Sequence, residues 1–266
     1  MADTIEREMP NEAIESNLSK LGFDEGHRGV HTSRTMMFKE LELVLATLPN
    51  GSSPQDIRLA IIEDNVLGKA TRSGRKYSAN KLIDLYSFNP ELQLFFAFEF
   101  LWREASASRP VLALMLALCR DCVLRTTVES ILRVPFGHSI PQVQLYECLL
   151  LGFTSKYAET TLQSTAQNAA SSWRQSGHIR GRNPIVRTKA PADFHALAFA
   201  ILIGYLRGLR GHILLASDWI SILDFNSYEL ESAIIEAHKH GLITSRKIGE
   251  VIELTPGPHL LKGGDA

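Results

Sequence analysis

Residues 160–189 read TTLQSTAQNAASSWRQSGHIRGRNPIVRTK, and the two halves of this stretch have different character. The first half predicts a helix over Thr160–Trp173, and Gly177 marks the point where the helical segment stops. Past this glycine, branched apolar residues lie among Arg, Asn and Pro, which favours a short hairpin around Gly181–Pro184. The stretch therefore predicts a helix followed by a basic β-ribbon.

The chain before this stretch is predicted to be helical, because its apolar residues recur every three or four positions. Breaks are expected at Pro49–Gly51, Asn65–Gly74 and Pro135–Pro141. The predicted helices are Met36–Leu48, Pro54–Asp64, Arg75–Tyr86, Leu92–Trp102, Val111–Leu118, Thr127–Leu132 and Val143–Leu151.

The chain after it ends in a pattern typical of a winged helix. A helix is predicted over Phe194–Arg207, and a second one over Ser227–His240, where Asn226 and Glu229 have the spacing of a capping box. Two short alternating segments, Leu242–Arg246 and Glu250–Leu254, follow as a two-stranded wing.

These patterns predict a mainly α fold: a multi-helix protein with helix-turn-helix or winged-helix-like modules and short β-hairpins. Four parts are expected along the chain. They are a flexible N-terminal arm (1–32), a helical domain with a basic helix-turn-helix-like segment (33–137), a helical pair with a basic ribbon (138–191) and a winged-helix-like C-terminal module (192–258).

The composition is that of a globular protein with no strong overall charge. The 266 residues are 45% hydrophobic, and 28 Lys and Arg oppose 29 Asp and Glu, for a net charge of -1. No apolar run approaches the roughly 20 residues that span a bilayer. The 3 cysteines are too few for a disulfide framework. We expect a cytoplasmic protein without membrane contact, whose interaction with nucleic acid must be local.

Two stretches contain basic residues and no acidic ones: residues 65–83 and residues 160–192. Cations held on a rigid frame displace the counterions condensed on DNA, and a helix N-terminus adds N–H donors for phosphate. The alternative is a pair of solvated surfaces. We interpret the following residues as nucleic-acid-binding: Lys69, Arg72, Arg75, Lys76 and Lys81 in the first stretch, and Arg174, His178, Arg180, Arg182, Arg187 and Lys189 in the second.

The second stretch is the better candidate for groove contact. Its predicted helix is rich in Ser, Thr, Gln and Asn, which hydrogen-bond phosphates and base edges, as in a recognition helix. The Arg180-Gly181-Arg182 tip suits a minor groove or a pair of phosphates. The first stretch is interpreted as a surface that positions phosphates.

No residue pattern indicates catalysis, a cofactor, a metal ion or a small-molecule substrate. Cys119 and Cys122 have C-x-x-C spacing without a second pair. Gly68-Lys69-Ala70-Thr71 lacks the first glycine of a phosphate-binding loop, and His238 and His240 point to different faces of their helix. The sequence therefore predicts a non-enzymatic protein.

The segments EDNVLGKATRSGRK (Glu63–Lys76) and SSWRQSGHIRGR (Ser171–Arg182) resemble the BrxA family of BREX phage-defence systems, over about Ser33–Leu254. The resemblance implies a small, mostly helical protein that binds double-stranded DNA. It also implies that the gene lies beside those of a methyltransferase, ATPases and a phosphatase-like protein.

We thus expect a DNA-binding component of a BREX-type system, with other BREX proteins as further partners. The alternative is an interaction scaffold that docks acidic partner proteins of a defence complex.

Overall fold

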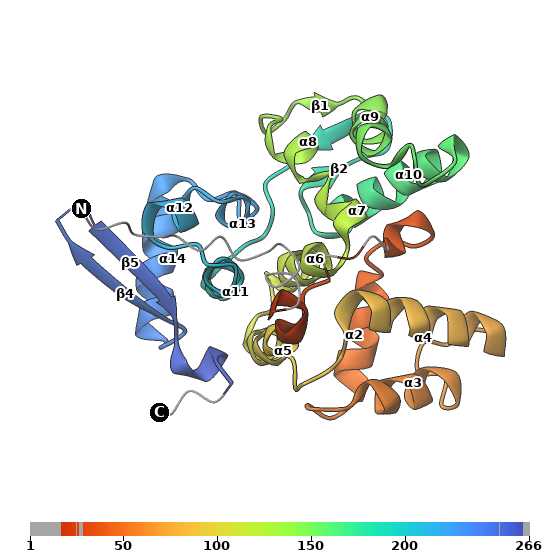
Figure 1. The fold of residues 1–266 in the computed structure, drawn as a ribbon, viewed down its shortest axis with the longest axis horizontal. Coiled ribbons are helices and arrows are strands. Elements are labelled where there is room, and N and C mark those ends of the chain that lie inside the picture. Colours follow the sequence, from red (N-terminus) through yellow and green to blue (C-terminus); the bar gives the residue numbers. More distant parts are fainter. Residues whose placement is uncertain (1–16, 25, 27–28, 250, 263–266) are drawn as a thin grey trace, which may run out of the picture.

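The computed structural model describes residues 17–24, 26, 29–249 and 251–262. Helices α5 (Gln93–Glu104) and α6 (Arg109–Arg120) lie near the middle of Figure 1, and three groups of elements surround them. The described residues are mainly helical, with two small antiparallel sheets. The predicted mainly α class is therefore confirmed.

Two apolar helices form the centre of the core. Residues Val111–Cys119 of α6 are all buried, as are residues Ala196–Gly204 of α11 (Phe194–Leu206). A helix that is apolar all round needs cover on every side. Buried residues form one continuous cluster from Phe23 to Leu260, so the predicted domain boundaries stay a prediction. No helix in the described part of the chain has the length and apolar character needed to cross a membrane.

The first group consists of α2 (Phe38–Thr47), α3 (Pro54–Ile62) and α4 (Arg72–Tyr86), close to their predicted positions. Ser53 caps α3, as its hydroxyl accepts from the backbone N–H of Asp56 at 3.2 Å. Helix α4 begins earlier than expected. Its cap is the hydroxyl of Thr71, which accepts from Gly74 N–H at 3.1 Å and fixes the helix start.

The second group contains the predicted helical pair and ribbon, together with one strand that the sequence did not indicate. Its elements are α7 (Cys122–Arg125), α8 (Val128–Leu132), β1 (Ser139–Ile140), α9 (Gln142–Phe153), α10 (Glu159–Gln175), β2 (Ile179–Arg180) and β3 (Ile185–Arg187). The strand order is β1-β3-β2, with Ser139 opposite Val186 and Ile179 opposite Arg187. Strand β1 lies in the predicted break at Pro135–Pro141, because a two-residue strand has no periodicity and exists only through its pairing with β3.

The third group follows α11. It consists of α12 (Gly211–Leu215), α13 (Asp218–Ser221), α14 (Ser227–Lys239), β4 (Ile243–Ile248), β5 (Val251–Pro256) and the 3-10 helix η2 (Pro258–Leu260). The predicted capping box is confirmed: Asn226 and Glu229 each accept from the backbone N–H of the other at 2.9 Å. The predicted terminal strands form the β4–β5 hairpin.

The expectation of a flexible arm over residues 1–32 is wrong where the structure describes it. Residues 1–16, 25, 27 and 28 lie outside the described residues. Phe23, Val30 and His31 are 2%, 5% and 0% exposed, and Val30–Thr32 forms the 3-10 helix η1. The partners of these side chains lie far away in the sequence; those of His31, for example, are Asp121 and Ser172. The composition of residues 1–32 alone therefore did not indicate that they are buried.

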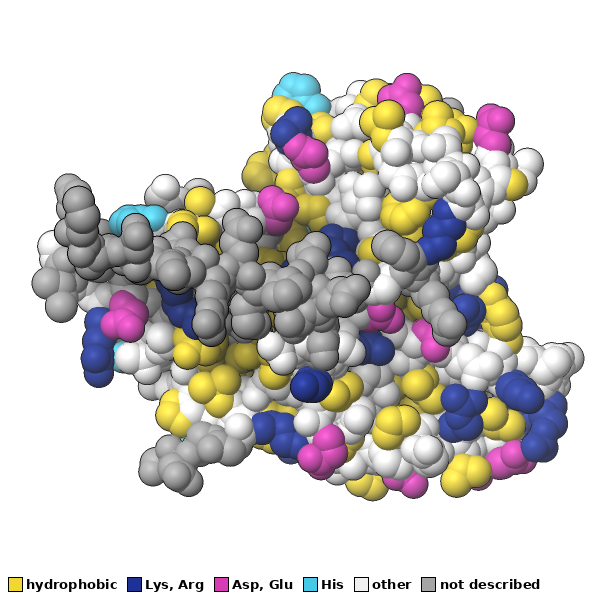
Figure 2. All heavy atoms as spheres, in the orientation of Figure 1, with side chains coloured by type: hydrophobic (Ala, Val, Ile, Leu, Met, Phe, Trp, Pro, Cys, Tyr) yellow, Lys and Arg dark blue, Asp and Glu magenta, His cyan; other side chains and the backbone are white. Residues whose placement is uncertain are grey.

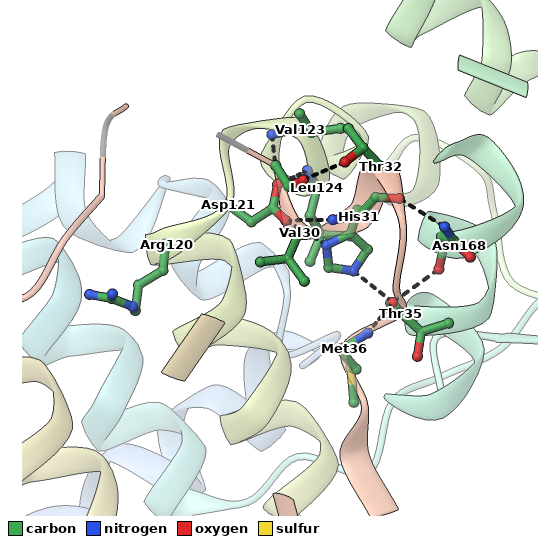
Figure 3. A network of polar contacts seen from close by, with 12 residues as sticks. Val30, His31, Thr32, Thr35, Met36, Arg120, Asp121, Val123, Leu124 and Asn168 are labelled. Atoms are coloured by element: carbon green, nitrogen blue, oxygen red, sulfur yellow. Dashed lines mark hydrogen bonds and ion pairs between the residues drawn. The ribbon is translucent and has the colours of Figure 1, made fainter. Parts of the chain in front are cut away.

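A buried polar network holds this N-terminal segment against α10 (Figure 3). The His31 ring lies 2.7 Å from Asp121 Oδ2 through Nδ1 and 2.8 Å from Ser172 Oγ through Nε2. The Asn168 amide donates to the His31 carbonyl at 2.9 Å, and Met36 N–H donates to Ser172 Oγ at 2.8 Å. Helix α10 therefore has one face tied to the N-terminal segment.

Asp121 also caps the next helix. Its Oδ1 accepts from the backbone N–H groups of Val123 and Leu124, each at 3.0 Å. Burial by itself would raise the pKa of Asp121, but His31 and the backbone N–H donors outweigh it and hold that pKa below its usual value. One carboxylate thus joins the end of α6, the start of α7 and the N-terminal segment.

Replacing His31 by Ala should lower the free energy of unfolding by about 3 kcal/mol, because it strips a buried carboxylate and a buried hydroxyl of a partner. Urea unfolding followed by circular dichroism measures this. Replacement of the exposed His138 by Ala is the matched control, with an expected change within about 0.5 kcal/mol. A loss below about 1 kcal/mol in the His31 variant would contradict the structural role assigned to the network.

Candidate nucleic-acid interface

A groove of about 750 Å³ lies between α9, α10 and the β2–β3 hairpin, and we call it the α10 groove. Arg174 and Arg182 line it, and no acidic residue is among the described residues that do. Its polar lining comes largely from one stripe of α10, which consists of the exposed Gln163 and Gln167 and the half-buried Ser171. Between these polar side chains lie small apolar residues of the same helix. The groove is therefore polar and positively charged on an apolar floor.

Two of the predicted arginines, Arg174 and Arg182, line this groove, and Arg180 lies next to them in the sequence of the hairpin. Arg174 Nε donates to the carbonyl of Gly181 at 2.8 Å, which joins the end of α10 to the hairpin tip. Gly181 has φ +73°, and a Cβ there would lie 2.5 Å from the Pro184 carbonyl oxygen, so the tight tip requires glycine. Arg180 and Arg182 flank the tip and are exposed.

The charges at this end act on each other. Partial burial lowers the pKa of Arg174, and the positive charge of Arg182 lowers it further. Both effects disfavour the charged guanidinium, and a bound anion would oppose the second. This end of the α10 groove therefore suits a phosphate group.

His178 is not part of the surface, and its prediction as a nucleic-acid-binding residue is wrong. The side chain is 0% exposed. Its Nε2 donates to the Ile222 carbonyl at 2.8 Å, and its Nδ1 lies 2.8 Å from the Ser176 hydroxyl. Burial lowers the pKa of His178 to about 4, so the ring is neutral at pH 7. It links the second group of elements to the third.

Arg187 is likewise buried, at 2% exposed, and its predicted contact with nucleic acid is wrong. Its guanidinium forms a two-pronged ion pair with Asp224, with one of the two bonds at 3.0 Å. It also donates to the His178 carbonyl at 3.0 Å. The positive charge of Arg187 is thus balanced inside the protein by Asp224, which lies 37 residues away in the sequence.

Lys189 is exposed but pairs with both carboxylate oxygens of Glu229. The hydrogen bond from Lys189 is the main cause of the lowered pKa of Glu229. Of the six predicted residues in the second stretch, the structure therefore brings Arg174 and Arg182 together at the α10 groove, with Arg180 exposed on the same hairpin.

In the first basic stretch, carboxylates that lie outside the stretch pair with three of the five cations. Lys69 Nζ lies 3.3 Å from Glu40 Oε1. Arg72 donates to both oxygens of Glu63, at 2.6 and 2.8 Å. Lys81 Nζ lies 3.7 Å from Oδ2 of Asp84, which is three residues further along α4. Three of the five positive charges in residues 65–83 are therefore offset by a nearby carboxylate.

Arg75 and Lys76 complete this stretch in the first turns of α4. Lys76 is exposed, whereas Arg75 is half-buried and its Nε has no hydrogen-bond partner among the described residues. Figure 2 shows Lys and Arg side chains gathered over the outer end of α4 with carboxylates beside them. The first stretch is thus a mixed surface that lies apart from the α10 groove (Figure 1).

Some residues of the groove could not be found from the sequence. Val143 and Tyr146 of α9 line the wall that faces α10. In the sequence they belong to an ordinary apolar helix pattern, and no local signal marks them as part of a surface. Their role follows from how α9 docks beside α10 and the hairpin.

The row Asp121, His31, Ser172 has the order of side chains found in nucleophilic serine sites. Here Ser172 is 0% exposed, and its hydroxyl already contacts Met36 N–H and donates to the Asn168 carbonyl at 3.0 Å. No face of the hydroxyl is open to a substrate. We assign this row a structural role.

Stability should depend on pH through His178. Between the ordinary pKa of 6.5 and the folded-state pKa of about 4, the unfolded chain binds a proton that the folded chain excludes. The free energy of unfolding should therefore fall as pH is lowered, by about 3 kcal/mol from this group alone by pH 4. Urea unfolding from pH 7 to 4.5 should show a smaller decrease for His178→Gln than for the wild type. Parallel curves would contradict this assignment.

No protein-family model matches the chain, and no curated protein matches its sequence. The resemblance to the BrxA family stays a prediction, and the function must be argued from the α10 groove and its surroundings.

Proposed function

We propose that this protein binds double-stranded DNA without chemical action on it, through α9, α10 and the β2–β3 hairpin. The observation that carries the proposal is the order strand, helix, helix, hairpin, with β1 paired to β3 across the sheet. Winged-helix DNA-binding domains share this order. In helix-turn-helix proteins the second helix of the pair lies in the major groove, which is the place we propose for α10.

The distribution of charge supports the same surface. Arg174, Arg180 and Arg182 lie where α10 meets the hairpin, and the described residues that line the groove beside them include no acidic side chain. Arginine forms charge-assisted hydrogen bonds with phosphate and is the side chain favoured in narrow minor grooves. With α10 in a major groove, the hairpin tip would contact the neighbouring backbone or minor groove.

Residues at the start of α4 provide a secondary contact in this proposal. Arg75 and Lys76 are the two cations of the first stretch for which no carboxylate partner is seen among the described residues. They would bind phosphates without reading bases. Their contribution would be small beside that of the α10 groove.

The cellular part of the proposal is a role as a DNA-binding component of a BREX-type phage-defence system in the cytoplasm, with other BREX proteins as partners. It rests on the resemblance of residues 63–76 and 171–182 to the BrxA family.

A second candidate is an interaction scaffold within such a defence complex, which docks acidic partner proteins. It is favoured by the start of α4, where Lys76 is exposed and no carboxylate partner is seen for Arg75 or Lys76 among the described residues, so these cations could meet an acidic surface. A nuclease-treated preparation that retains a stoichiometric acidic partner, while pure protein never shifts duplex DNA, would support the scaffold over direct binding.

Binding to a fluorescent DNA duplex should weaken steeply with added salt. The triple variant Arg174→Gln, Arg180→Gln, Arg182→Gln should bind more weakly at low salt. For this variant, the slope of log affinity against log salt concentration should be smaller in magnitude by about 2 to 3, because each lost phosphate contact removes about 0.9 from that slope. Fluorescence anisotropy over a salt series measures both quantities.

The matched control is the triple variant Lys69→Gln, Arg72→Gln, Lys189→Gln. It makes the same change in net charge at cations that already have a carboxylate partner. Its affinity should stay close to that of the wild type. Equal losses in the two triple variants, or wild-type binding that does not respond to salt, would contradict the proposed interface.

A further inference from the structure

We infer that Gln163 and Gln167 read A·T base pairs in the major groove, so that the preferred DNA site contains A·T pairs opposite the first half of α10. This inference rests on the proposed function. It names the side chains that would determine which base sequence is preferred. Both glutamines are exposed, lie one helical turn apart and line the α10 groove.

The buried side of α10 fixes which residues face outward. Asn168 and Ser172 are engaged by the N-terminal segment through the His31 carbonyl and the Met36 N–H group. Trp173 is 0% exposed, and its indole N–H donates to Thr127 Oγ1 at 2.7 Å. The helix therefore cannot rotate about its axis without breaking these contacts. The outward stripe of Gln163, Gln167 and Ser171 is a fixed feature of the fold.

The chemistry of this stripe selects among base pairs. A glutamine amide can donate and accept at once, which matches N7 and the N6 amino group of adenine in the major groove. Guanine is typically read by Arg or Lys, and cytosine by Asp or Glu. Residues 160–173 contain no charged side chain, so this part of α10 has no reader for a G·C pair except a hydroxyl, which does not discriminate.

The surroundings favour the thymine half of the same pair. Ala166 and Ala170 lie beside the glutamines on α10 and line the groove. Small apolar side chains are suitable contacts for the thymine methyl group. The first charged residue toward the hairpin is Arg174, and its tie to Gly181 places it at the edge of the groove, where a phosphate would lie.

The spacing sets the expected pattern. Four residues of α-helix rise by about 6 Å, and base pairs are stacked about 3.4 Å apart, so the two glutamines can contact pairs that are one or two steps apart. The preferred site should therefore contain two A·T positions within about three base pairs.

Selection from a library of random DNA duplexes, with the full chain as the binding protein, tests this inference. Wild-type protein should enrich two closely spaced A·T positions. Gln163→Ala and Gln167→Ala should each lose the preference at one position, with roughly a tenfold fall in discrimination against G·C there. Gln167→Arg should move the preference at its position from A to G.

Ser164→Ala is the matched control, because Ser164 is exposed on the same helix, lies outside the groove lining and donates to the Thr161 carbonyl at 2.9 Å. It should leave the selected pattern intact. Salt-sensitive binding without base preference, enrichment of G·C, or a pattern that both Gln→Ala variants share with the wild type would overturn the inference and leave the proposed function standing. Absence of any duplex binding by the wild type would overturn both.

Discussion

The buried contact of His31 with Asp121 and Ser172 is the interaction on which the arrangement of the second group depends. It joins three segments that are far apart in the sequence: the N-terminal segment, the junction of α6 and α7, and α10. Each polar atom in it would be costly to bury alone, so the three segments are stable together or not at all. Because the network occupies one face of α10, the opposite face is left for solvent or a ligand.

A second set of buried polar contacts fixes the hairpin relative to the third group. The Arg187–Asp224 ion pair and the bond from His178 to the Ile222 carbonyl both connect the region of β2 and β3 to the segment before α14. Removal of either partner of a buried ion pair leaves an uncompensated charge, so this connection resists movement. The hairpin tip is therefore held on a rigid base, as the proposed binding of phosphates at a fixed spacing would require.

Folding changes which of the basic side chains keep their positive charge free of a carboxylate partner. Along the sequence, the two basic stretches look similar because neither contains an acidic residue. In space, Lys69, Arg72 and Lys189 each meet a glutamate, whereas the α10 groove is lined by arginines and no carboxylate among the described residues. Local charge along a chain is thus a poor guide to local charge on a surface, and the hairpin end of α10 is the more strongly basic of the two sites.

The sequence alone predicts nearly all of the longer helices, both hairpins and the capped starts of α3 and α14, because periodicity, caps and turn residues act over a few neighbouring positions. It also singled out Arg174, Arg180 and Arg182. It could not identify strand β1 or the short helix α12, which have too few residues for a pattern. Only the tertiary structure decided that His31, His178 and Arg187 are buried and that the N-terminal segment packs on α10, since a side chain's exposure and charge partners depend on residues brought together by folding rather than by sequence.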